Sequence, residues 1–248
     1  MEEREPAAVD ALFAEALRAG ESRPRAREAL ARALDEQVLA ATLRRAVPVA
    51  VLEEVAAARP WSERPRVLAR VVLSPRAPQP LSLRLVSALY WRDLADVAAT
   101  PRVPAAVRSR AESILRDGLP DMRLGDRVTL ARLATPPLLP PLLADGERQV
   151  AESTLVNPRL REEDLVAALR KDDVSAALVE AVVVSSRWAA NYAVRLTLVL
   201  QPRTPLPIAL QQISALVPRD LRRVAGEAAL RPLVRAAARE VLEAAQNS

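Results

Sequence analysis

The stretch LSPRAPQPLSL, residues 73–83, recurs 127 residues later as LQPRTPLPIAL, residues 200–210, and this repetition decides the fold. Both stretches carry proline at the same three places, and an arginine follows the first proline in each. When the sequence is shifted by 127 residues against itself, residues 35–115 match residues 162–242 with 28 identities in 81 ungapped positions. Shared alanine, leucine and arginine content does not align three prolines with three prolines. We therefore interpret the match as an internal duplication.

The duplication divides the chain into two halves, residues 1–121 and residues 122–248. It also aligns Trp61 with Trp188, which is informative in a chain with three Trp, two Tyr and one Phe. The segment between the halves, RDGLPDMRLGDR (116–127), holds two of the five glycines. Long internal repeats are typical of stacked modules that cannot bury their apolar faces alone. We therefore expect the two halves to form one continuous stack, with a hinge near Gly118 and Gly125 as the open alternative.

The composition predicts helices. Half of the residues are apolar, glycine is scarce, and alanine, leucine, arginine and glutamate dominate the helical patterns. Apolar residues recur at helical spacing in LVSALYWRDLADVA (85–98) and LVRAAAREVLEAA (233–245). We expect roughly a dozen helices of about 10–16 residues and no strands. A polar residue followed by proline predicts a helix start, because the polar side chain caps free N–H groups and proline fits the first turn. These dipeptides are Ser74-Pro75, Thr100-Pro101, Thr135-Pro136, Asn157-Pro158 and Gln201-Pro202.

Two kinds of segment resemble known helical-repeat families. PAAVRSRAESIL (104–115) and LVRAAAREVL (233–242) are similar to the second helix of HEAT-type repeats. LVNPRLREEDLVAAL (155–169) and the stretch 200–210 resemble the Asn-Pro-x-x-Pro phrase of leucine-rich-repeat-variant proteins. The resemblance implies an all-α protein, a right-handed α-solenoid of HEAT-like helical repeats with a curved face. It implies no activity, and the iron–sulfur cluster of one variant family needs cysteines that this chain lacks.

The residue types argue against an enzyme. His and Cys are absent, which excludes Ser-His-Asp and Cys-His nucleophilic sites and Cys/His metal sites. No phosphate-binding glycine loop, dinucleotide motif or nucleophile elbow is present. The carboxylate clusters REED (161–164) and KDD (171–173) are interpreted as a helix start and a turn. We expect no catalytic residues, no cofactor and no metal.

The charges are mixed and no membrane segment is predicted. Net charge is +5, with Lys171 the only lysine, and 31 acids are interleaved with the bases. The most apolar stretch, residues 174–200, is interrupted by Glu180, Arg187 and Arg195, so we expect no membrane span. The first residues, MEEREPAAVD, have no signal-peptide pattern, and a cytoplasmic location is the expectation.

Aromatic and arginine residues are the candidates for partner binding, because both are enriched at interface hot spots. Trp61 and Trp188 are interpreted first as wedges between helix layers and alternatively as partner anchors. The arginine after the helix-starting proline opposes the helix dipole, so it either bridges to the adjacent repeat or lies on an anion-binding edge. Arg92-Asp93 and Arg219-Asp220 are expected near helix starts. The candidate partner-binding residues are Trp61, Arg76, Trp91, Arg159, Arg187, Trp188, Tyr192 and Arg203.

Two functions remain open from the sequence. The favoured one is a non-enzymatic scaffold or adaptor whose arginines and aromatics, Tyr90 included, contact another protein. The alternative is nucleic-acid binding, as in HEAT-like DNA glycosylases for alkylated bases, which are of similar size. No catalytic motif of that class is matched, and alternating acids weaken a continuous phosphate track.

Overall fold

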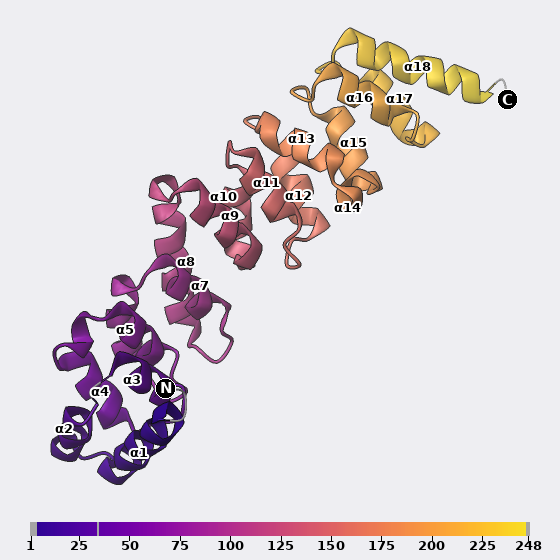
Figure 1. The fold of residues 1–248 in the computed structure, drawn as a ribbon. Helices are drawn as coiled ribbons and strands as arrows, with labels where there is room; N and C mark the ends of the chain where they lie inside the picture. The colour runs from indigo at the N-terminus through magenta and orange to yellow at the C-terminus, as the bar shows by residue number, and fades with distance from the viewer. Residues whose placement is uncertain (1–3, 34, 247–248) are drawn as a thin grey trace. The chain divides into compact units, whose positions relative to one another are not determined.

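The computed structural model describes residues 4–33 and 35–246, and this part of the chain is entirely helical. It contains eighteen α-helices and four short 3₁₀-helices, without a strand in the described residues (Figure 1). The all-α fold class is confirmed. Twelve of the α-helices have only seven to nine residues, so the expectation of about a dozen longer helices was wrong. The frequent prolines shorten them, because proline cannot donate the backbone hydrogen bond that continues a helix.

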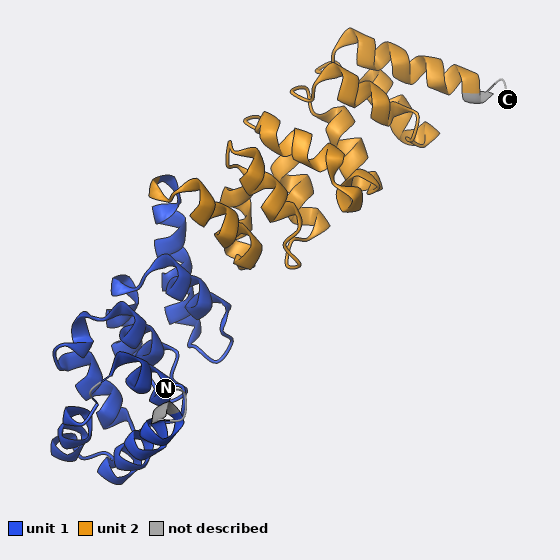
Figure 2. Ribbon diagram, viewed as in Figure 1, with its two compact units in different colours: residues 1–120 blue, residues 121–248 orange. Residues whose placement is uncertain are grey.

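The chain forms two compact units, residues 1–120 and residues 121–248 (Figure 2). The sequence placed the boundary one residue later, between 121 and 122. Each unit has its own packed interior, and each is described separately.

Unit 1 consists of two rows of helices. In the first row α1 packs on α3, α3 on α5 and α5 on α7; in the second row α2 packs on α4 and α6 on α8. The helices are α1 (Arg4–Ala19), α2 (Arg23–Ala31), α3 (Glu36–Thr42), α4 (Val49–Ala57), α5 (Pro65–Val72), α6 (Gln79–Leu85), α7 (Trp91–Ala99) and α8 (Ala105–Gly118), with the 3₁₀-helices η1 (Trp61–Glu63) and η2 (Val86–Ala88).

Unit 2 repeats this arrangement after one additional helix, α9, which packs on α11. In its first row α10 packs on α12, α12 on α15 and α15 on α17; in the second row α11 packs on α13 and α16 on α18. The 3₁₀-helix η3 (Leu119–Asp121) spans the boundary. The helices of unit 2 are α9 (Leu124–Leu133), η4 (Pro136–Leu138), α10 (Leu139–Leu143), α11 (Arg148–Leu155), α12 (Glu162–Leu169), α13 (Ala176–Val184), α14 (Ser186–Ala189), α15 (Tyr192–Leu200), α16 (Leu206–Ile213), α17 (Pro218–Gly226) and α18 (Pro232–Gln246).

Helix bounds in the two units correspond at the 127-residue offset of the sequence match. Helices α4 and α13 correspond residue for residue, as do α7 and α17. Helices α5, α6 and α8 start where α15, α16 and α18 start after the shift. Each packed pair within the rows of unit 1 has its counterpart in the rows of unit 2.

The polar-proline dipeptides end helices instead of starting them, so that prediction was wrong at four of the five positions. Ser74-Pro75 follows the last residue of α5, and α6 begins only at Gln79, after Pro78. The same happens at Thr100, Asn157 and Gln201, after α7, α11 and α15. Only Thr135-Pro136 starts a helical element, the 3₁₀-helix η4. Proline cannot continue the hydrogen bonds of the helix before it, so the chain turns there.

Each of these four proline turns has the same backbone geometry. The N–H of the fourth residue donates to the carbonyl of the first, at 3.0–3.1 Å, in turns that begin at Ser74, Thr100, Asn157 and Gln201. Proline occupies the second position and arginine the third, an arrangement that β-turns favour because proline presets its φ angle. Arg76, Arg102, Arg159 and Arg203 are therefore the third residues of β-turns.

Buried polar side chains of unit 2 connect one helical hairpin to the next. The fully buried Asn157 donates from Nδ2 to the carbonyls of Ala131 and Ala134, at 2.8 and 3.1 Å. Gln201 donates from Nε2 to the carbonyls of Leu169 and Lys171, at 2.8 and 2.9 Å. These carbonyls lie near or beyond helix ends, where helical donors are missing, so the two side chains supply hydrogen bonds there. None of the described helices is long and apolar enough to cross a membrane.

Candidate interaction surfaces

A groove of about 490 Å³ lies between α2, α4 and α6 of unit 1. Its walls carry two ion pairs between α2 and α4: Arg23 with Glu53 at 2.7 Å and Arg27 with Glu54 at 2.8 Å. Apolar side chains complete the lining, together with Arg84. The apolar residues are Ala57, Pro78, Pro80 and Leu81. In the described residues Arg84 is exposed and makes no ion pair, so it is the one groove cation that is left free.

Glu54 is the most buried charged residue of the groove, with only 8% of its side chain exposed. Arg27 supplies the compensating charge, and the hydrogen bond from its Nε to Glu54 raises the pKa of the Arg27 guanidinium. A buried carboxylate requires such a partner, since an unpaired charge in the interior is costly. The Arg27–Glu54 pair therefore fixes the wall between α2 and α4.

The corresponding place in unit 2 has a different chemistry. The residues aligned with Glu54, Ala57 and Arg84 are Ala181, Val184 and Gln211. Glu180, which is aligned with Glu53, also lies near an arginine of the neighbouring helix: it is 4.0 Å from Arg148 of α11. The charged groove is thus a property of unit 1.

Trp61 and Trp188 lie in the interiors of their units, with exposed fractions of 9% and 3%. The indole N–H of Trp188 donates to the carbonyl of Leu155 at 2.8 Å, across two successive hairpins. Their burial favours the interpretation as wedges between helix layers. Neither side chain offers a large exposed ring to a partner in this conformation.

The remaining aromatic candidates are more exposed. Tyr90 is 63% exposed, and Trp91 beside it is half-buried, with the guanidinium of Arg92 5.1 Å from its ring centroid. Tyr192 donates to the Asp220 carboxylate at 2.5 Å and accepts from the Val217 N–H at 3.2 Å. Burial, together with the Asp220 hydrogen bond, raises the pKa of the Tyr192 hydroxyl. Tyr192 therefore joins α15 to the start of α17.

The four candidate arginines divide into two groups. Arg159 donates to the carbonyl of Leu133 at 3.3 Å, and Arg187 donates to the carbonyl of Leu160 at 3.2 Å. Arg187 also lies 4.2 Å from the Trp188 ring centroid. These two bridge to the preceding hairpin through backbone carbonyls instead of carboxylates. Arg76 and Arg203 are exposed and make no side-chain hydrogen bond or ion pair with the described residues. The expectation that Arg76, Arg159 and Arg203 follow a helix-starting proline was wrong, because all three lie in β-turns.

Asp93 and Asp220 both lie in first turns of helices, as expected, but their surroundings differ. Burial and the nearby Asp96 raise the pKa of the Asp93 carboxyl, while Arg66 and Arg70 oppose the rise. Two acidic groups, Asp93 and Asp96, and two arginines therefore interact here. REED forms the first turn of α12, where the Arg161 side chain lowers the pKa of Asp164.

The described residues contain no group of three or more acidic side chains arranged to hold a metal ion. Three buried polar side chains donate hydrogen bonds to backbone carbonyls and so stabilise the fold: Asn157, Gln201 and Thr154.

The sequence analysis missed the residues of the groove. Arg27, Glu54 and Arg84 come from three helices, and no local pattern indicates that they converge. Arg102 was also missed, although TPRVP (100–104) repeats the pattern of SPRAP (74–78) and signalled a second turn of the same kind.

No family model, no curated protein and no solved structure matches this chain.

Proposed function

We propose that the chain is a non-enzymatic protein-interaction scaffold, an α-solenoid built by duplication of a 127-residue unit. The aligned helix bounds and the recurrent packing of rows support the duplication. Two rows of short helices, each contacting its sequence neighbours, support the solenoid interpretation. Such an architecture exposes long surfaces for binding.

The observation that carries the proposal is the groove between α2, α4 and α6. Its volume of about 490 Å³ is in the range of ligand-binding pockets, but it is open and lies across three helices. The apolar lining of Ala57, Pro80 and Leu81 suits an apolar side chain of a partner. Arg84 at the same groove suits a carboxylate of that partner. We therefore assign the groove to a peptide segment or helix of another protein.

Photo-crosslinking tests this assignment. A photoreactive amino acid at position 84 is expected to crosslink a protein of the native cell to the full-length chain. The same amino acid at position 211, the aligned residue on α16, serves as the control. Leu81→Glu should abolish the position-84 crosslink, because it places a charge in the apolar lining, and Ile208→Glu at the aligned position should not. An identical crosslinking pattern at positions 84 and 211 contradicts the assignment.

The DNA- or RNA-binding alternative has less support at this groove. Glu53 and Glu54 neutralise Arg23 and Arg27, which leaves Arg84 as the free cation. Nucleic-acid affinity rises with the number of phosphates neutralised, so one free cation supplies little. Tight, steeply salt-dependent binding of duplex DNA in an anisotropy titration would replace the scaffold proposal.

A further inference from the structure

Three connections on one edge of unit 1 carry arginine without acid. Four connections lead from the first row of helices to the second, and the first of them, residues 20–22, holds Glu21, whose carboxylate accepts from the Ala50 N–H at 3.3 Å. The other three, residues 43–48, 73–78 and 100–104, form what we call the basic edge. Their sequences are LRRAVP, LSPRAP and TPRVP, with four arginines and no Asp or Glu. Because α3, α5 and α7 pack side by side in one row, the connections that follow them lie next to one another.

Three of the four arginines are free to bind a ligand. Arg45 pairs with Asp10 at 2.6 Å and lies 4.9 Å from the Phe13 ring centroid. Arg44, Arg76 and Arg102 are exposed and make no side-chain hydrogen bond or ion pair with the described residues. These three have no side-chain partner among residues 4–33 and 35–120.

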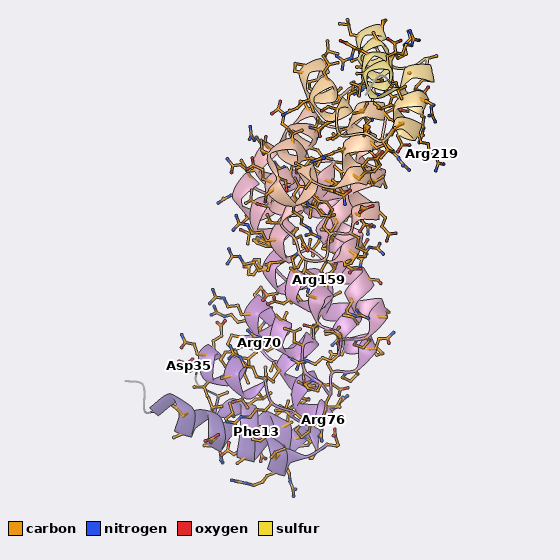
Figure 3. All side chains as sticks on the ribbon, turned by 90° about the vertical axis from the view of Figure 1, so that its right-hand side faces the viewer. Phe13, Asp35, Arg70, Arg76, Arg159 and Arg219 are labelled. Carbon is orange, nitrogen blue, oxygen red and sulfur yellow. The ribbon has the colours of Figure 1, made fainter. Side chains whose placement is uncertain are left out.

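On the opposite edge of unit 1, the arginines of the connections are paired with acids. There the connections contain Arg32, Arg59 and Arg64, and each is paired with a glutamate. Their partners are Glu15, Glu63 and Glu36. Figure 3 labels Asp35 of this edge and Arg76 of the basic edge, which lie on opposite sides of unit 1. The charge is therefore segregated between the two edges.

Proline turns hold two of the free arginines. Arg76 lies in the turn closed by the Ala77 N–H and the Ser74 carbonyl, and Arg102 in the turn closed by Val103 and Thr100, both at 3.1 Å. A second proline, Pro78 or Pro104, follows each turn and precedes the next helix. A preorganised backbone reduces the conformational entropy that binding costs.

We propose that the basic edge of unit 1 binds an extended acidic segment of a protein partner. Packed helices lie about 8–10 Å apart, so successive turns present cations at about this interval. A polyproline II peptide advances about 3.1 Å per residue, so acidic side chains at every third position recur at about 9 Å. Guanidinium groups bind carboxylates through charge-assisted, often bidentate, hydrogen bonds. The spacing and the charge both fit such a segment.

An acidic peptide fits this edge better than a nucleic acid does. The three connections contain no aromatic residue on which a base could stack. Three free cations also neutralise few phosphates, whereas nucleic-acid affinity depends on that number.

Unit 2 supplies the matched control. Its connections 170–175 and 227–231 mix both signs of charge, and they lie before and after the connection 201–205, which carries Arg203 and no acid. Arg203 occupies the same position of the same β-turn as Arg76 and is equally exposed. A change at Arg203 therefore reproduces the turn and the charge, but between neighbouring connections that carry Asp172, Asp173 and Glu227.

Fluorescence anisotropy on the full-length protein tests the proposal. The probe is a labelled proline-alanine peptide with glutamate at every third position, compared with the same peptide carrying glutamine. We expect the glutamate peptide alone to bind, with an affinity that falls as salt rises. The double variant Arg76→Glu/Arg102→Glu should weaken binding about tenfold, while Arg203→Glu should leave it unchanged. Unchanged thermal melts would confirm that the variants remain folded.

Three outcomes overturn the proposal: no binding of the glutamate peptide, equal weakening by Arg203→Glu, or tighter binding of single-stranded or duplex DNA that displaces the peptide. The proposal rests on the scaffold function, but the two fail separately. If the position-84 crosslink persists while the peptide does not bind, only the acidic-segment proposal is rejected. If the position-84 crosslink is absent while the peptide binds the basic edge, only the groove assignment is rejected.

Discussion

Asn157 and Gln201 perform the same structural task in two different connections of unit 2. Each side-chain amide donates two hydrogen bonds to carbonyls of the preceding hairpin, and each side-chain carbonyl accepts from the N–H two residues later. Those acceptor bonds come from Arg159 at 2.8 Å and Arg203 at 3.2 Å. Each residue also begins a proline β-turn. One side chain thus fixes the turn and joins it to the preceding hairpin.

Asn157→Ala is expected to lower the free energy of unfolding by about 2–4 kcal/mol, because it leaves two buried carbonyls without donors. Equilibrium urea denaturation followed by circular dichroism measures this loss. Gln149→Ala is the control, since Gln149 is exposed and bonds to no described residue. A loss no greater than that of the control would show that the Asn157 bonds contribute nothing.

Trp188→Phe should cost more stability than Trp61→Phe, although the two tryptophans align. Trp188 loses the hydrogen bond to the Leu155 carbonyl, whereas the Trp61 indole makes no hydrogen bond to the described residues. We expect the difference between the two variants to be about 1 kcal/mol, with a similar loss of packing in both. Urea denaturation of the two variants side by side measures it. Equal losses would mean that packing alone accounts for both tryptophans.

Arg27→Ala is expected to destabilise unit 1 more than Arg23→Ala does, because it leaves the buried Glu54 carboxylate unpaired. Arg23→Ala removes a neighbouring pair in which both side chains are exposed to solvent, and should cost about 0–0.5 kcal/mol. Differential scanning fluorimetry ranks the two variants, and denaturation gives the energies. The double variant Arg27→Ala/Glu54→Gln removes the unpaired charge. If it recovers none of the stability lost in Arg27→Ala, the buried charge is not the cause of that loss.

Asp164→Asn should reduce stability at neutral pH and not in strong acid. Arg161 lowers the pKa of Asp164 below the ordinary 3.8, so the ionised form stabilises the folded state. That contribution is complete above the unfolded pKa and disappears as pH falls through the lowered folded value. We expect a loss of about 0.5–1 kcal/mol at about pH 7 that disappears toward about pH 2. A loss independent of pH would exclude the charge as its origin.

Asp93→Asn should show the opposite pH dependence. Burial raises the pKa of Asp93 above 3.8, so the folded state favours the protonated carboxyl. Its contribution to stability is therefore greatest below the unfolded pKa and declines as pH rises through the raised folded pKa. The variant should gain stability relative to the natural chain as the pH rises through this window. Denaturation curves of the variant and the natural chain, recorded from acid to neutral pH, measure this difference in stability. A gain that appeared only in acid would contradict the prediction.

The sequence predicted the helical class because composition and helical spacing are local properties. It also aligned Trp61 with Trp188, and both proved to be buried. The proline dipeptides were misinterpreted because the same residues suit a helix start and a turn after a helix. The backbone decided between the two, since the N–H of the fourth residue closes a turn at Ser74 and at Gln201.

The sequence by itself determined that the chain is helical, lacks His and Cys, and matches itself over 81 positions at an offset of 127 residues. Only the tertiary structure decided which charges face one another. Arg27 and Glu54 are 27 residues apart and meet because α2 and α4 pack in one row. Arg44, Arg76 and Arg102 lie along one edge because each follows a helix of the same row. Local propensity depends on neighbours in the chain, whereas a binding surface depends on helices that packing brings together from distant positions.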